Sequence, residues 1–473
     1  MAPAYRHCGL PPLVIWRKRT IFHSSLVCAR FKLVEDSFSS IYGRAEKATS
    51  YHRRFMMQQT TKLKRKLLLI VLALLLASLV PIYVIAVQLI AADPLKSDFS
   101  KLYMSADFFL NGESMYTPVS IYTWGEIDQP WKYPEDLLHP NLNPPLQTLL
   151  FLPLTLLDYY DAIVVWSILS GLAGVISVLL IMKYAGHIKL NGVTIIAALL
   201  LLLIYYPTLM TVLYAQVSLF LFLFVTLVWL AARHGHRKTA GVILGLTMSL
   251  KAFTLFFLLL FFVRRQWLVL ILAGGTMVLL NGLAVLLAGW SEHQAYLAAL
   301  DTITWYGASW NASFLGFFSR IFGGTENIPW INAPHLTYVI SGALSVLFVL
   351  LNIVVVRPCA NNQYRQLEFD VGFGLAIVSM LLLSPLGWIY YFPLLIIPMI
   401  VIWQGCRTLR LSRYYLILLL TAWLLSSFPH PLIPSEDINN PWQWFILAGT
   451  YLYALLLLTI LLTFVQQRAR SAG

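Results

Sequence analysis

Long uninterrupted runs of apolar residues, separated by shorter polar segments, dominate this chain. Three clear examples are residues 67–92, 194–213 and 338–356. Each is about as long as a helix that crosses the hydrocarbon of a bilayer, for which about 20 residues suffice. The runs lack the alternation of polar and apolar positions that the strands of a membrane β-barrel would show. The pattern therefore predicts an all-α polytopic membrane protein.

One apolar stretch, residues 239–263, decides the expected topology. It is long enough to cross a bilayer once, but Lys251 interrupts its middle, and Arg264 and Arg265 follow its end. The stretch can instead form two half-length helices that enter the membrane and return, with Lys251 at the turn. Both of its basic ends then lie on the same side of the membrane. Each arm would then have about 11 residues, too few to span. We therefore expect about twelve transmembrane or re-entrant helices, two of them half-length.

The distribution of charge gives the expected orientation. Basic residues flank the apolar runs at alternate ends, including four of them in residues 62–66, whereas the long loop 93–161 is mainly acidic. Ends rich in Lys and Arg face the cytoplasm by the positive-inside rule. We expect both termini in the cytoplasm. The large loops 93–161 and 290–335 would lie on the external or periplasmic face of the cell (inner) membrane.

The net charge of +13 would suit a nucleic-acid partner, but 14 of the 33 Lys and Arg residues precede Leu67. The basic residues thus indicate the orientation of the chain in the membrane, and we expect no nucleic-acid partner. Residues 1–55 show weak periodicity and form a basic tail. Either this tail is real, or the working chain begins near Met56 or Met57. We assign residues 56–473 to the membrane domain.

Residue types that hold metals are sparse. His139 and His335 fall in the two large loops without ligand spacing, and the chain has four cysteines that show no metal-site pattern. We therefore expect neither a metal site nor a cofactor.

Asp98 is the strongest candidate for chemistry. It follows the first apolar run directly and begins the sequence Asp98-Phe99-Ser100-Lys101, which predicts an amphipathic helix just outside the membrane. A carboxylate beside low-dielectric lipid can keep a basicity suited to accepting a proton from a hydroxyl. The alternative is that Asp98 only caps this helix.

An ordered set of short motifs resembles glycosyltransferase family 87, the polyprenyl-phosphate-mannose-dependent mannosyltransferases with the GT-C fold. The first loop matches at Asp98, Tyr103, Ala106, Leu110, Gly112 and Tyr116. The further matches are Asn143-Pro144-Pro145-Leu146, Leu152-Pro153-Leu154, Ala215-Gln216-Val217, residues 240–245 leading to Lys251, Trp310-Asn311-Ala312-Ser313-Phe314, and Leu383-Ser384-Pro385-Leu386-Gly387-Trp388. The set runs in order from Asp98 to about Pro398.

The resemblance implies a GT-C-like enzyme that transfers a hexose, mannose by analogy, with inversion and without a metal. The donor would be a polyprenyl-phosphate sugar, and the acceptor a lipid-linked or envelope glycan on the non-cytoplasmic face. Asp98 matches the family's catalytic base. Because the leaving group is a lipid phosphate, its departure needs stabilised negative charge. Lys251 and Arg320 are the candidates for this role. The alternatives are snorkelling of Lys251 to the interface and contact of Arg320 with lipid headgroups.

The remaining candidates would bind or orient the sugar substrates. Tyr103 lies beside Asp98 on the expected helix, and Asn143 begins an Asn-Pro-Pro turn that would shape the pocket. Gln216, Asn311 and Ser313 offer neutral hydrogen bonds to sugar hydroxyls. The alternative is that the loop backbone satisfies their polar groups.

The chain departs from the family after Trp388. Where the family commonly has His, this sequence has Tyr390 and Tyr391, which donate hydrogen bonds but carry no charge near neutral pH. Two other functions remain open: a secondary transporter, which would place several charged groups at mid-membrane, and a noncatalytic membrane partner.

Overall fold

The computed structural model describes residues 56–57, 59–60, 63–92, 97–117, 141–186, 188–323, 329–358, 363–432 and 449–472 of the 473. The chain divides into two compact units, Met1–Ile70 and Val71–Gly473. The described residues of the first unit are helical. The predicted basic tail, residues 1–55, lies outside the described residues.

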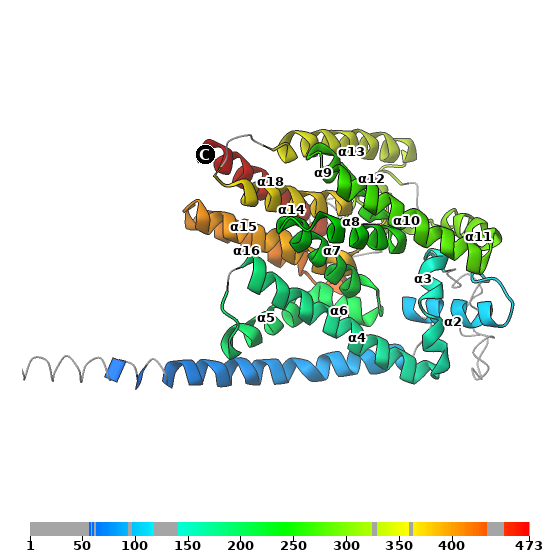
Figure 1. Ribbon diagram of the computed structural model, residues 1–473, viewed down its shortest axis with the longest axis horizontal. Coiled ribbons are helices and arrows are strands. Elements are labelled where there is room, and N and C mark those ends of the chain that lie inside the picture. Colours follow the sequence, from blue (N-terminus) through cyan, green and yellow to red (C-terminus); the bar gives the residue numbers. More distant parts are fainter. Residues whose placement is uncertain are drawn as a thin grey trace, which may run out of the picture. The chain divides into compact units, whose positions relative to one another are not determined.

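Among the described residues every regular element is a helix, and a single isolated antiparallel bridge joins Asn311 to Trp388. The elements of the second unit are α2 (Asp98–Leu110), α3 (Pro145–Leu149), η5 (Leu152–Leu156), α4 (Tyr159–Leu180), η6 (Ile181–Ala185), α5 (Gly192–Ile204), α6 (Tyr206–Leu213), α7 (Ser218–Arg233), α8 (Arg237–Leu250), η7 (Ala252–Phe256), α9 (Phe257–Val263), α10 (Trp267–Ala288), α11 (Trp290–Leu300), η8 (Trp305–Gly307), α12 (Phe314–Phe322), α13 (Pro334–Val356), α14 (Arg365–Leu383), η9 (Ile389–Leu395), α15 (Ile396–Thr408), α16 (Arg413–Ser426), η10 (His430–Leu432) and α18 (Thr450–Ala472). The long helices run roughly side by side (Figure 1).

Seven described helices are long and apolar enough to cross a membrane, and the bent pair α5–α6 would make eight. The seven are Leu63–Ala92, Tyr159–Ala185, Trp267–Ala288, Pro334–Val356, Arg365–Leu383, Ile389–Thr408 and Thr450–Ala472. They identify an integral membrane protein, as the apolar pattern predicts. Helices α7 and α16 are also apolar but shorter, with 16 and 14 residues. The total of about twelve segments stays a prediction.

The apolar run 194–213 is not the continuous helix that its composition suggests. It divides into α5 and α6, whose axes differ by 65°. Tyr205 at the junction is extended, with φ −68° and ψ 106°. Pro207 stands at the start of α6, where its missing N–H costs no helical hydrogen bond. Hydropathy alone does not register this bend.

The stretch 239–263 forms a helical hairpin with Lys251 between its two arms, as predicted. Helix α8 ends at Leu250, Lys251 is extended, and η7 and α9 lead back. Both flanks of the stretch meet the same turn of α14. Before it, Arg233 Nε lies 2.9 Å from Asp370 Oδ2, and after it, Arg264 Nη2 donates to the Glu368 carbonyl at 2.9 Å. The chain therefore returns to the end from which it entered, which we call the Arg233 end.

The hairpin is fixed against α10 by direct backbone contact. A Cβ added to Gly245 would lie 2.5 Å from the Ala273 carbonyl oxygen and 2.6 Å from Thr276 Cβ. Such distances leave no room for any side chain at residue 245. Glycine at this position therefore lets α8 pack closely along α10. This packing fixes the position of Lys251, which follows the last residue of α8.

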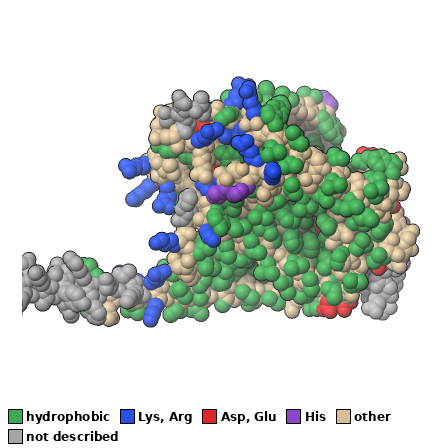
Figure 2. Space-filling view, in the orientation of Figure 1, with side chains coloured by type: hydrophobic (Ala, Val, Ile, Leu, Met, Phe, Trp, Pro, Cys, Tyr) green, Lys and Arg blue, Asp and Glu red, His purple; other side chains and the backbone are tan. Residues whose placement is uncertain are grey.

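The core of the bundle lies around α14 and α15. In the most apolar part of α14, 83% of the residues are buried, against 17% in α10 and 28% in α13. Most of the exposed residues of α10 and α13 are apolar, such as Val278, Leu279 and Val346. In a membrane protein such faces contact lipid. Figure 2 accordingly shows a broad hydrophobic surface, with Lys and Arg side chains gathered toward one end of the view.

Candidate active site

Asp98 is the first residue of α2, at the opposite end of the bundle from the last turn of α18 (Figure 1). The N-cap of this helix is Ser97, whose Oγ accepts a hydrogen bond from Ser100 N at 3.1 Å. Asp98 N donates to the Tyr214 carbonyl at 3.0 Å. The alternative role of Asp98 as the helix cap is therefore wrong, and its carboxylate has other partners.

Three groups surround the Asp98 carboxylate. Lys101 Nζ lies 2.9 Å from Oδ1, and Gln216 Nε2 donates to Oδ2. Burial by itself would raise the pKa of Asp98, but the charges and hydrogen bonds of Lys101, Lys251 and Gln216 outweigh burial and hold this pKa below its ordinary value. The side chain is one-third exposed. Asp98 is thus ionised at neutral pH and open to a substrate.

The turn between α6 and α7 positions the side-chain amide of Gln216 against the Asp98 carboxylate. Ala215 in this turn has φ 46°, a left-handed conformation that a residue with a Cβ seldom adopts. Hydrogen bonds hold the turn on both sides, since Trp166 Nε1 donates to the Ala215 carbonyl at 3.0 Å and Gln216 N donates to the Thr211 carbonyl at 2.9 Å. The strained backbone therefore serves to place the Gln216 amide.

Lys251, at the tip of the hairpin, reaches the same end of the bundle. Its Nζ donates to Asn143 Oδ1 at 2.6 Å. Asn143 is held by Asn141, whose Oδ1 accepts from both its backbone and side-chain nitrogens, and by Tyr116 Oη, which donates to its carbonyl at 2.6 Å. Burial lowers the pKa of Lys251 to about 8, while the charge of Asp98 opposes this shift. Lys251 is therefore a cation whose charge is easily lost.

Tyr390 and Tyr391, in η9, complete the cluster. Both are nearly buried, and Asp98 interacts electrostatically with each of them and with Tyr214. Ring centroids lie 6.1 Å apart for Tyr214 and Tyr390, and 4.7 Å apart for Phe253 and Tyr391. The aromatic rings therefore form one wall beside the carboxylate.

Two candidates for sugar binding, Asn311 and Ser313, use their polar atoms inside the protein. Asn311 is fully buried, and its amide donates to the carbonyls of Tyr306 and Pro385 and accepts from Ser313 N and Gly387 N. The Ser313 hydroxyl caps α12 by accepting from Gly316 N at 3.0 Å. These residues join two loops, as the backbone alternative predicted.

Arg320 and Tyr103 direct polar atoms to backbone carbonyls. The Arg320 guanidinium donates to the carbonyls of Ala308 and Asn311 at 2.8 and 3.1 Å. Tyr103 Oη donates to the Leu157 carbonyl at 2.8 Å. The structure thus brings together Asp98, Gln216, Lys251, Asn143, Tyr390 and Tyr391, and it directs the polar atoms of Arg320, Tyr103, Asn311 and Ser313 to the protein backbone.

Lys101 is the main residue that sequence reasoning missed. It stands three positions after Asp98, a spacing at which side chains on a helix meet. The pairing could have been predicted from this spacing alone. Tyr214 was also missed, because nothing in the sequence connects the end of α6 with η9 across the bundle.

The described fold is that of an all-helical integral membrane protein with an ionic cluster at one end. The sequence profile of glycosyltransferase family 87 matches residues 141–385, more than half of the chain, so the protein belongs to that family. The protein is therefore a membrane glycosyltransferase. The matched region contains Asn143, Gln216 and Lys251. No curated protein and no solved structure matches the chain.

Proposed function

We propose that this glycosyltransferase transfers a hexose, most simply mannose, from a polyprenyl phosphate carrier to a lipid-linked or envelope glycan acceptor. The reaction inverts the anomeric centre and uses no metal or other cofactor. The working domain is residues 56–473, with a GT-C-like fold of about twelve segments. Both termini lie in the cytoplasm of the cell, and the Asp98 cluster faces the external or periplasmic side.

The observation that supports this proposal most directly is that Asp98 and Lys251 lie at the same end of the bundle, where each influences the other electrostatically. A carboxylate from the first loop and an ammonium from the tip of a re-entrant hairpin interact at one end of the bundle. Inverting transfer from a lipid phosphate needs a base for the acceptor and a cation for the leaving phosphate. The cluster offers both groups on adjoining elements.

The chemical step then uses each group once. The acceptor hydroxyl attacks the anomeric carbon as Asp98 takes its proton, so that a C–O bond to the acceptor forms. The C–O bond to the phosphate breaks, and its electron pair leaves with the carrier phosphate, which gains one negative charge. Lys251 stabilises that charge, and the Gln216 amide, which already donates to Asp98, orients the carboxylate.

Donor binding would also activate the base. In the free protein, Lys101 and Lys251 hold the pKa of Asp98 low, which makes it a weak base. An anionic phosphate placed beside these lysines opposes their effect and raises the pKa of Asp98. The carboxylate thus becomes more basic when the donor is present. Because Asp98 is a weak base until the donor binds, side reactions are limited before donor binding.

The other candidate residues have supporting roles in the proposal. Tyr390 and Tyr391 line the acceptor side in place of the family's His, and Asn143 orients Lys251. Asn311 and Ser313 shape the loop above the site. Tyr103 braces α2 against the connection to α4. Arg320 remains a candidate for the carrier phosphate, and in the free protein it supports the loop at Asn311.

The decisive experiment compares Asp98→Asn with Asp107→Asn, the same change on the same helix. Membranes with each variant are incubated with radiolabelled polyprenyl-phosphate mannose, and label in the lipid and glycan fractions is counted. We expect Asp98→Asn to lower transfer by about 1,000-fold, the scale of a general base, and Asp107→Asn to leave it unchanged. Activity should persist in a metal chelator.

Equal transfer by Asp98→Asn and the parent would remove Asp98 from the mechanism. Solute uptake driven by an ion gradient, without label transfer, would favour the transporter alternative. Absence of transfer by the parent with every lipid-linked hexose tried would favour the noncatalytic partner.

A further inference from the structure

A basic groove lies at the Arg233 end, away from the Asp98 cluster. It has a volume of about 730 Å³ and is bounded by the turn from α9 to α10 and by the last turn of α13. Arg264, Arg265 and Arg357 line it together with apolar side chains. None of the described residues that line the groove is acidic. A groove of this composition fits an anion that carries a hydrophobic portion.

The nearby acids are already paired. The Glu368 carboxylate lies 3.4 Å from Arg470 Nε, and the Asp370 carboxylate binds Arg233. Arg264 Nη2 donates to the Glu368 carbonyl at 2.9 Å, and its guanidinium lies over the Phe369 ring. Within the described residues none of the three groove arginines forms a salt bridge. The charges of the exposed Arg265 and Arg357 are therefore available to a ligand.

Arg265 occupies a backbone position that normally belongs to glycine. Its φ is 53°, at the end of α9, where Gln266 N donates to the Phe261 carbonyl at 2.9 Å in the manner of a helix C-terminal cap. Glycine adopts this conformation without strain, whereas a side chain does so at a cost. The chain nevertheless holds an arginine here, and its exposed side chain adds positive charge to the lining of the groove.

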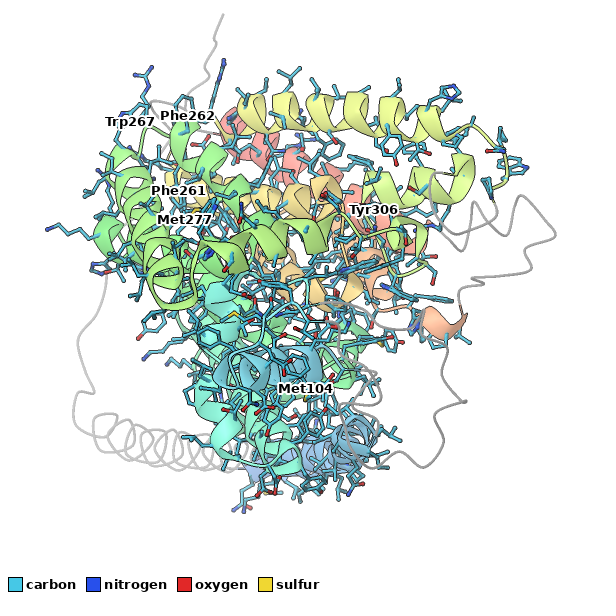
Figure 3. All side chains as sticks on the ribbon, turned by 90° about the vertical axis from the view of Figure 1, so that its right-hand side faces the viewer. Met104, Phe261, Phe262, Trp267, Met277 and Tyr306 are labelled. Atoms are coloured by element: carbon cyan, nitrogen blue, oxygen red, sulfur yellow. The ribbon has the colours of Figure 1, made fainter. Side chains whose placement is uncertain are left out.

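The apolar part of the groove has side chains typical of a membrane interface. Phe262 and Trp267 are 56% and 52% exposed, and their ring centroids are 5.5 Å apart. Figure 3 shows them together at the turn between α9 and α10. The adjoining helices α10 and α13 are mostly uncovered by protein. Exposed Trp beside arginines is typical of the boundary between hydrocarbon and headgroups.

We propose that this groove binds one anionic phospholipid of the surrounding bilayer. Its phosphodiester lies between the guanidinium groups of Arg265 and Arg357, and one acyl chain follows Phe262 and Trp267 down the faces of α10 and α13. Basic pockets between membrane helices recognise anionic headgroups in this way. The site is separate from the Asp98 cluster, so it goes beyond the proposed transfer reaction.

The test measures lipid binding to the purified full-length protein in a nonionic detergent by native mass spectrometry. Phosphatidylglycerol is the anionic probe and phosphatidylcholine the zwitterionic one. We expect phosphatidylglycerol to bind at least tenfold more tightly. Combining Arg265→Gly with Arg357→Gln should lower its affinity by roughly tenfold or more, because each arginine near a headgroup contributes to binding. Phosphatidylcholine binding should not change.

Two further variants keep the result interpretable. Arg265→Gly alone removes charge but suits the local backbone, so its thermal stability without lipid should equal or exceed that of the parent while phosphatidylglycerol binding weakens. Arg237→Gln removes an exposed arginine outside the groove and should change nothing. Unchanged phosphatidylglycerol binding in the double variant, or equal binding of both lipids by the parent, would overturn the proposal. Complete displacement of the lipid by inorganic phosphate would also overturn it.

Discussion

Two ionic clusters lie at opposite ends of this protein, and they differ in construction. At the Arg233 end, Arg233 Nε contacts both oxygens of Asp370 at 3.1 and 2.9 Å, and Trp229 Nε1 adds a third bond at 2.8 Å. The Arg233 and Asp370 side chains are 5% and 2% exposed, whereas Lys101 and Asp98 are 20% and 33% exposed. The first cluster is closed, and the second is open.

The difference indicates that one cluster is suited to a structural role and the other to binding a changing ligand. Arginine's planar group fits a carboxylate in a fixed geometry, so the closed cluster suits permanent structure. Lysine is a point charge on a flexible stem, and it can transfer its attraction from one anion to another. The proposed transfer, in which a phosphate arrives, gains charge and leaves, needs a flexible cation of the second kind. The following experiments test this contrast, in order of decreasing expected effect.

Breaking the closed cluster should mainly cost stability. We expect Asp370→Asn to destabilise the protein by about 3 kcal/mol, because it leaves a buried arginine without its counter-charge. Thermal unfolding in detergent measures this. Replacing both partners, with Asp370→Asn and Arg233→Met, should recover part of the loss. The folded fraction should keep the transfer activity of the parent. A loss of turnover in that fraction would contradict a purely structural role for the Arg233–Asp370 cluster.

Changing the hairpin lysine should mainly cost catalysis. We expect Lys251→Met to lower kcat/KM for the lipid-linked donor by about 100-fold, since a charge-assisted contact to phosphate contributes about 3 kcal/mol. Unfolding temperature should change little. Lys183→Met, an exposed lysine near the opposite end, is the matched control. A Lys251→Met enzyme with normal kcat/KM would exclude this lysine from the site.

The pH dependence of kcat/KM should show the same lysine. The pKa of Lys251 is about 8, so its charge is present below pH 8 and disappears above it. Activity should therefore fall by up to about tenfold per pH unit above 8, and Lys251→Arg should remove this fall because arginine stays charged. On the acid side activity should stay level to about pH 5, since the pKa of Asp98 is below its ordinary value. A fall that persists in Lys251→Arg would assign it to another group.

The smallest effect is expected from Lys101, which pairs with Asp98 near the surface. Lys101→Met should lower kcat/KM at neutral pH by about fivefold at most, as for an exposed ion pair. It should also raise the pKa of Asp98, because Lys101 lowers it more than any other group. The acid limb of the pH profile would then move to higher pH. Lys101→Arg should restore the parental profile, and an unmoved acid limb in Lys101→Met would show that Lys101 does not act on Asp98.

Sequence patterns predicted well which distant segments of the chain lie near Asp98. The lengths of the apolar runs and the charges that flank them located the hairpin, and the family resemblance brought Asp98, Gln216 and Lys251 to one end. The patterns could not tell which polar groups are already occupied. Asn311 looked available for a sugar, yet four hydrogen bonds from two loops saturate it.

Other details depend on contacts between distant segments. The bend at Tyr205 lies within an apolar run, and composition does not distinguish a bent run from a straight one. Tyr103 shares a helix with Asp98, but its hydroxyl finds the Leu157 carbonyl 54 positions along the chain. Periodicity shows which residues share a face. It does not show what that face meets.

The contact at Gly245 has a consequence for adaptation to different bilayers. Because the backbones of α8 and α10 touch there, the depth of Lys251 follows the position of α10 in the lipid. A thicker or thinner bilayer would tilt both helices together and carry the lysine with them.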